Sequence, residues 1–318
     1  MSPKPAVRAS GLIGGPMPEK EPRPDTEPLV RALNRAGIGG MPAAVWAAIA
    51  TALAPAGVHY SPADVESFAR AHPDQVDRHE TRDGPCYQPP FDPQREAIKA
   101  VLAVPSIERG VRELIGPSTV EDDVAVALVG LLRTSADDPG VRSYLHLYLP
   151  AQCADGEGRG IEALRALAGE REVDRLLVAA LSRRAGRVSA PEAVALRREA
   201  VELFASTGQP GEAAAERARL ASSLQAAGDV PGAVREMEHA LDDYRRLAMR
   251  DSFQDRFVAV ALLNLGRLYS DAGRRGDAVK TLKAAVAGFK AIAREDHRFT
   301  EEVLLARQEL RRVRRRRR

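Results

Sequence analysis

The histidines and cysteines of this sequence do not fall into a spacing that would make a metal site or a catalytic pair. Six histidines are spread along the chain, and His79-Glu80 lacks the second histidine of an H-E-x-x-H zinc motif. Cys86 and Cys153 show no metal-ligand spacing and are too few for a disulfide framework, which favours a reducing cytoplasm. The sequence contains no G-x-S-x-G elbow and no G-x-x-x-x-G-K-[ST] loop. We therefore expect no catalytic residues, no metal and no cofactor.

Two pairs of adjacent acids could share a proton as a catalytic dyad. Asp122-Asp123 and Asp137-Asp138 each come where a helix is expected to begin, and the positive end of the helix dipole favours acids there. The glycine-rich stretch 156–160 follows an expected helix rather than a strand, so it predicts a loop and not a phosphate cradle. We interpret both features as structural.

The strongest charge feature lies at the C-terminus. Residues 311–318 read RRVRRRRR, and without them the net charge of +3 at pH 7 becomes negative. Such a run can neutralise the phosphates of a nucleic acid, with an affinity that falls as salt rises, or meet anionic lipid or an acidic partner. The alternative is a solvated end without apolar partners. The residues that we name as polyanion-binding are Arg314, Arg315, Arg316, Arg317 and Arg318.

The elements that must position any binding residues contain an internal repeat. The first copy has Leu220-Ala221, Leu224, Ala233, Met237 and Ala240, and the second has Leu265-Gly266, Tyr269, Ala278, Leu282 and Ala285. Every position shifts by 45 residues, from Leu220 to Leu265, and a glycine-containing turn separates two helices in each copy. Small residues at Ala221 and Gly266 would let the second helix pack closely against the first.

This spacing resembles the tetratricopeptide pattern over residues 213–292, with a degenerate earlier copy around Ala193, Glu199 and Ala200. Two features depart from the family. The period is 45 rather than about 34 residues, and the tryptophan-like position holds Arg217 or Leu262. The resemblance implies helical hairpins that bind another polypeptide; a plain antiparallel bundle is the alternative.

In tetratricopeptide arrays the first helix of each hairpin lines the concave face. Carried over by register, the partner-binding positions are Arg219, Ser222, Gln225, Leu263, Asn264, Arg267 and Ser270. One exposed apolar residue, two arginines and several hydrogen-bonding groups suit an extended peptide with an acidic residue. Alternatively, two hairpins make too short a groove, and these residues meet water or the preceding helices.

A second resemblance covers residues 28–155. The stretches GMPAAVWAAIA (40–50), SPADV (61–65), RDGPCY (82–87) and VRSYLHLYLP (141–150) look like the part of STAND-type signalling ATPases that follows their nucleotide-binding domain. The resemblance implies a winged-helix module and a helical arm that leads to sensor repeats. Phe91 is followed by Asp92, where the family has histidine. Because the P-loop is absent, the resemblance implies the regulatory and sensor portion without the motor.

Local sequence patterns predict the helices and strands of the N-terminal half of the chain. We expect helices at 29–36, 43–54, 62–71, 93–103, 107–115, 121–132, 141–153 and 160–181, and one β-hairpin formed by 76–81 and 86–88 around Asp83-Gly84. Ser61 and Asp64 have the register of a capping box. The 62–71 helix would be the one offered to DNA, but Asp64 and Glu66 outnumber Arg70, which disfavours direct base reading.

Together these patterns predict a mainly α protein with a winged-helix-like module, containing a small β-hairpin, followed by tetratricopeptide-like hairpins. The expected boundaries are 1–26 for a disordered leader, 27–104 for the module, 105–186 for a helical arm, 187–310 for the repeats and 311–318 for the basic tail. The charge-free stretch 41–63 is cut by Pro42 and Pro55, so it falls short of the roughly 20 residues of a membrane span.

The function that we expect is a non-catalytic protein-binding scaffold, or a regulatory or sensor component of a bacterial signalling system, in the cytoplasm. Its partner would be a protein or a peptide. The alternative is a nucleic-acid-associated regulator that uses the arginine tail, whose contact with nucleic acid we expect to be weak.

Overall fold

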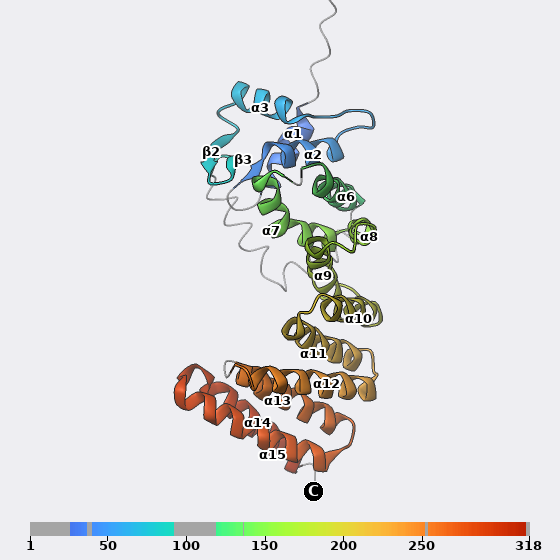
Figure 1. Cartoon of the computed structure of the whole chain (residues 1–318), viewed down its shortest axis with the longest axis vertical. Coiled ribbons are helices and arrows are strands. Elements are labelled where there is room, and N and C mark those ends of the chain that lie inside the picture. Colours follow the sequence, from blue (N-terminus) through green and yellow to red (C-terminus); the bar gives the residue numbers. More distant parts are fainter. Residues whose placement is uncertain (1–25, 37–39, 92–118, 136, 252–253, 316–318) are drawn as a thin grey trace, which may run out of the picture.

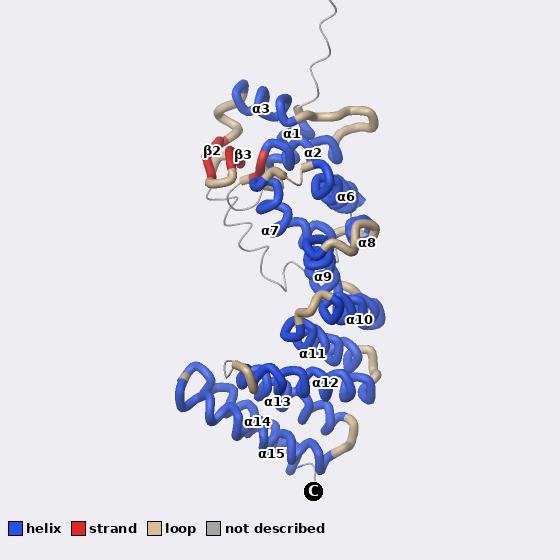
Figure 2. Tube along the Cα trace, in the orientation of Figure 1, coloured by secondary structure: helices blue, strands red, loops and turns tan. Residues whose placement is uncertain are grey.

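Helices stacked one after another form most of the molecule. The computed structural model describes residues 26–36, 40–91, 119–135, 137–251 and 254–315 (Figure 1). The N-terminal elements lie at one end of an elongated stack and the C-terminal helices at the other, and a small sheet occurs only near the N-terminal end of the described part (Figure 2). This confirms the mainly α fold class. Residues 1–25 of the leader expected at 1–26, the helices expected at 93–103 and 107–115, and residues 316–318 lie outside the described residues.

The N-terminal elements are three helices and three short strands. They are α1 (Glu27–Leu33), β1 (Met41–Pro42), α2 (Ala43–Leu53), α3 (Pro62–Ala71), β2 (Asp77–Thr81) and β3 (Gly84–Gln88). The strands form one antiparallel sheet in the order β1-β3-β2, and β2 pairs with β3 from Asp77↔Gln88 to Thr81↔Gly84. The predicted hairpin is therefore confirmed.

The expectation that the hairpin holds the only strands is wrong, because β1 pairs with β3 through Met41↔Tyr87 and Pro42↔Cys86. A two-residue strand has no alternation that a sequence pattern could reveal, and its partner lies far along the chain. Gly40 makes the approach feasible. Its φ is +76°, and a Cβ at this position would lie 2.8 Å from the carbonyl oxygen of Tyr87.

A buried tryptophan and the predicted capping box fix the helices of this half. The only tryptophan of the sequence, Trp46 on α2, is fully buried and donates its indole N–H to the Leu29 carbonyl at 2.7 Å. At the start of α3, the backbone N–H of Asp64 donates to the Ser61 hydroxyl and the Asp64 carboxylate accepts from the Ser61 N–H, which is a complete capping box.

Four helices connect this end to the repeats: α6 (Thr119–Thr134), α7 (Pro139–Asp155), α8 (Arg159–Arg165) and α9 (Arg171–Ala185). The prediction of one helix over 160–181 is wrong, because α8 ends at Arg165 and α9 begins at Arg171. Gly169, with φ +117°, lies between them in a conformation that an α-helix does not contain. The pattern of apolar residues alone did not reveal the break.

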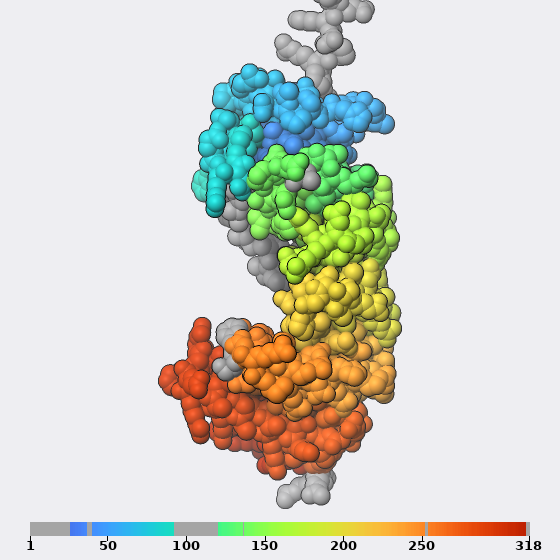
Figure 3. Space-filling view, viewed as in Figure 1, coloured from blue at the N-terminus to red at the C-terminus, as the bar shows by residue number. Residues whose placement is uncertain are grey.

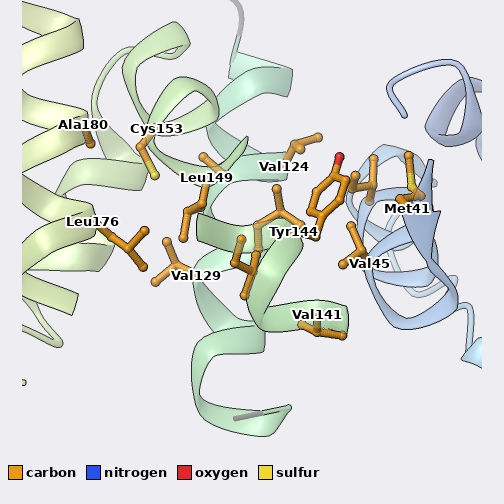
Figure 4. Close-up of a cluster of buried hydrophobic side chains, with 14 of the residues drawn as sticks. Met41, Val45, Val124, Val129, Val141, Tyr144, Leu149, Cys153, Leu176 and Ala180 are labelled. Atoms are coloured by element: carbon orange, nitrogen blue, oxygen red, sulfur yellow. The ribbon is translucent and has the colours of Figure 1, made fainter. Parts of the chain in front are cut away.

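One apolar core runs from α1 to α9 and includes residues of every described helix between them and of strands β1 and β3. Figure 4 shows part of it, from Met41 and Val45 through Tyr144 and Leu149 to Leu176. Side chains from both ends of this region pack in the same cluster, so the N-terminal module and the α6–α9 helices share their core.

The C-terminal half consists of α10 (Ala190–Ser206), α11 (Pro210–Ala226), α12 (Val230–Ala248), α13 (Asp255–Asp271), α14 (Arg275–Glu295), the short 3-10 helix η2 (His297–Phe299) and α15 (Thr300–Arg315). A second core runs from α10 to α15. Helix α10 belongs to both cores, because Ala193, Leu196 and Ala200 pack in the first while Val194 and Val201 pack in the second. Among the described residues, no helix is long and apolar enough to cross a membrane.

Candidate partner-binding face

The two predicted repeat copies are two helical hairpins, α11–α12 and α13–α14. All the repeat positions named from the sequence, from Leu220 to Ala285, are buried. Gly266 lies at a close approach of the two helices of the second hairpin, since a Cβ there would lie 2.6 Å from Cγ of Leu282 on α14. The small residues therefore lie where the two helices of a hairpin touch, as the spacing predicts.

Polar contacts join α11, α13 and α15, the helices that alternate with α12 and α14 in the chain. The side-chain amide of Gln225 on α11 donates to the Asp271 carboxylate on α13 at 2.8 Å. One helix further, the guanidinium of Arg267 lies 3.3 Å from the Glu309 carboxylate on α15. These contacts bring surface residues of three helices side by side.

We call this surface the repeat face and define it by its exposed or half-buried residues. They are Ser222 and Gln225 on α11, Val260, Asn264, Arg267 and Ser270 on α13, and Leu305 and Glu309 on α15. Five of them were named from the sequence, namely Ser222, Gln225, Asn264, Arg267 and Ser270. These five lie on α11 and α13, and two of them, Gln225 and Arg267, contact neighbouring helices.

Leu263 was expected to be an exposed apolar contact, and this expectation is wrong. Its side chain is buried, at 4 % exposed, and belongs to the second core. Helix α15 packs against both α14 and α13. The repeat register assigned Leu263 to the exposed side of α13 but did not show that the second core extends to this residue.

Arg219 is exposed but takes part in a structural ion-pair network. Its guanidinium donates to the fully buried Glu216 at 2.8 Å, and Glu216 also accepts from Arg197 on α10 at 2.5 Å. Arg197 donates in addition to the Ser223 hydroxyl at 3.1 Å. Arg219 therefore helps to compensate a buried charge at the α10–α11 junction, which no motif in the sequence indicated.

Two apolar side chains of the repeat face were not named from the sequence. Val260 is 43 % exposed on α13, one turn before Asn264, and Leu305 is 39 % exposed on α15, one turn before Glu309. Val260 could have been found from the sequence, because it precedes the named Asn264 by one helical turn and therefore shares its side of the helix.

Residues 258–298 match the family model of the tetratricopeptide repeat. The match begins in α13, includes all of α14 and ends in η2. It coincides with the second of the two predicted copies, and α11–α12 forms a hairpin with the same buried positions. Tetratricopeptide repeats typically mediate protein–protein contacts, which agrees with a protein-binding role. We find no match to this chain among curated proteins.

The expectation that the basic tail lacks apolar partners is wrong for residues 311–315. They continue α15, and Val313 is buried in the second core against α14. The guanidinium of Arg275 also donates to the Arg314 carbonyl at 2.6 Å, which caps the end of the helix. The expected polyanion-binding residues Arg314 and Arg315 are therefore helical, whereas Arg316, Arg317 and Arg318 lie outside the described residues.

The carboxylate of Asp122 and the thiols of Cys86 and Cys153, which the sequence analysis considered for catalysis or metal binding, have structural environments. Asp122 is buried and accepts from the backbone N–H groups of Glu157, Gly158 and Arg159 at 2.7, 3.2 and 2.9 Å, so this carboxylate caps α8. Burial raises the pKa of the Cys153 thiol to about 12 and also raises the pKa of Cys86, which keeps both thiols protonated at neutral pH. Within the described ranges, no group of three or more His, Cys, Asp and Glu side chains could hold a metal.

Proposed function

We propose that the chain is a non-catalytic scaffold that binds an extended segment of another protein across the repeat face. The observation that carries this proposal is the alignment of α11, α13 and α15 through the Gln225–Asp271 and Arg267–Glu309 contacts. These contacts fix the spacing of three neighbouring helices before any partner arrives. A preformed surface reduces the entropy that is lost on binding.

The chemistry of the repeat face favours a partner that carries both apolar and polar side chains. Val260 and Leu305 offer apolar contacts, while Ser222, Gln225 and Ser270 offer hydrogen bonds. Arg219, at the edge of the face with its side chain 58 % exposed, can meet an acidic residue of the partner. A short extended peptide with alternating apolar and acidic residues fits this set.

We further propose that the scaffold is a regulatory or sensor component of a bacterial signalling system and works in the cytoplasm. Support comes from the N-terminal half, where three helices and a three-stranded sheet have the arrangement expected of a winged-helix module. The hairpin rests on α7, because the Ser143 hydroxyl donates to the Asp83 carboxylate at 3.0 Å. The sequence resemblance to STAND-type proteins, without a P-loop, points to the same role.

The test is a comparison of co-purifying proteins with substitutions on and off the repeat face. The test variant is Ser222→Arg with Val260→Glu, which adds bulk and charge at two positions that are exposed in the folded chain. The control variant is His239→Arg with Lys283→Glu, at exposed positions of α12 and α14. We expect at least one partner to be recovered with wild type and control at equal levels and to be lost with the test variant. If the two variants recover the same partners in the same amounts, the repeat face is not the binding surface.

A further inference from the structure

The exposed side of α15 forms an arginine-lined hollow at the end of the helical stack. Its lining residues are Gln308, Arg311, Arg312 and Arg315, and it is open to solvent, with a volume of about 570 Å³. We call this the arginine surface. Helix α15 is the last described element, and the residues at the red end of the colour bar, which include it, lie at the end of the stack opposite the N-terminal elements (Figure 3). No further helix of the described chain covers this side.

The charges of the arginine surface are only partly compensated. Arg312 lies 2.8 Å from the Glu309 carboxylate, which Arg267 shares. Among the described residues, Arg311 and Arg315 form no ion pair, and Arg275 adds a further positive charge beside the C-terminal end of α15. The negative end of the helix dipole stabilises these cations but leaves their guanidinium groups able to donate outward.

We infer that the arginine surface binds the phosphate backbone of a nucleic acid. Guanidinium groups match phosphate oxygens as bidentate donors, and several on successive helical turns can meet successive phosphates. No aromatic side chain of the described residues lines the hollow, so it lacks a platform for stacking bases. The contact is therefore to the backbone and is independent of base sequence.

The structure of α15 favours nucleic acid over the two other anionic partners. Membrane binding by an amphipathic helix requires a free apolar face, but Val303, Ala306 and Val313 of α15 are buried in the second core, and only Leu304 and Leu305 among its apolar side chains are exposed. A phosphodiester backbone presents negative charges at regular intervals to arginines on adjacent helical turns, whereas an acidic protein segment does so only where its carboxylates have the same spacing.

Binding of the full-length protein to a fluorescent 20-bp DNA duplex at several salt concentrations tests the inference. Replacing Arg311, Arg312 and Arg315 by glutamine should weaken binding at 50 mM salt at least about tenfold. It should also lower the slope of log K against log salt by about 2–3, since each phosphate contact contributes about 0.9. Replacing the same three residues by lysine should retain most of the affinity, because lysine keeps the charge.

The matched control replaces the exposed Arg175, Arg198 and Arg235, on α9, α10 and α12, by glutamine. This variant has the same net charge as the test variant and should bind DNA like wild type. Three results would overturn the inference: no binding of wild type at 50 mM salt, equal weakening in both glutamine variants, or binding to phosphatidylserine vesicles without binding to DNA. Circular dichroism of each variant checks that the helices remain folded.

Discussion

In the second hairpin, α13 packs so closely against α14 at Gly266 that an added methyl group should destabilise the protein. A Cβ at this position would lie 2.6 Å from Cγ and 2.7 Å from Cδ2 of Leu282, which is fully buried. Gly266→Ala should therefore lower the free energy of unfolding by about 1–3 kcal/mol through overpacking. Gly130 on α6 is the control, because a Cβ there meets nothing within 4 Å, so Gly130→Ala should raise stability by about 0.5–1 kcal/mol. Urea unfolding measures both, and equal effects would show that the register is wrong.

The buried carboxylate of Glu216 makes the α10–α11 junction sensitive to its arginine partner. Arg197, whose side chain is 11 % exposed, compensates this charge from α10. Arg197→Met should lower the free energy of unfolding by about 3–5 kcal/mol, because the buried charge keeps only the more exposed Arg219. Adding Glu216→Leu should recover most of this loss. A double variant as unstable as Arg197→Met would mean that the arginine acts by packing and not by charge.

At the scale of elements, the predictions succeeded where a local pattern determines the structure. The Ser61 cap and the Asp83-Gly84 hairpin depend on residues a few positions apart, and the repeat depends on the same local spacing in each of two copies; all are present. Two of the misses depend on packing between elements. Strand β1 exists because it meets β3, and Leu263 is buried because it packs in the second core, which several helices form. The short-range spacing of apolar residues does not encode which distant element will cover a given surface.

The end of α15 shows how one buried residue changes the interpretation of a charged segment. Val313 is 2 % exposed and packs in the second core, although arginines surround it in the sequence. Val313→Ala should lower the free energy of unfolding by about 1–2 kcal/mol through the loss of two buried methyl groups. Arg311→Gln, at an exposed position two residues earlier, should leave stability within about 0.5 kcal/mol of wild type. Thermal melts that rank the two variants in the opposite order would contradict the packing of α15.

At the scale of the whole molecule, α10 joins two cores into one structure. Because its side chains pack alternately in the first and the second core, loss of one core removes contacts that support the other. Trp46 reports on the first core alone, and circular dichroism at 222 nm reports on all helices. We predict that the two signals unfold at the same urea concentration. Separate midpoints would show that the two cores are independent.

The central claim is that a partner protein lies across α11, α13 and α15, and site-specific photo-crosslinking in cells tests it most directly. A photoreactive amino acid would replace Ser222, Val260 or Ser270 on the repeat face, and His239 or Lys283 on α12 and α14 as controls. The account predicts a discrete crosslinked product of higher mass from the repeat-face positions and none from the controls. Crosslinks that form only at the control positions, or equally at all five, would contradict it.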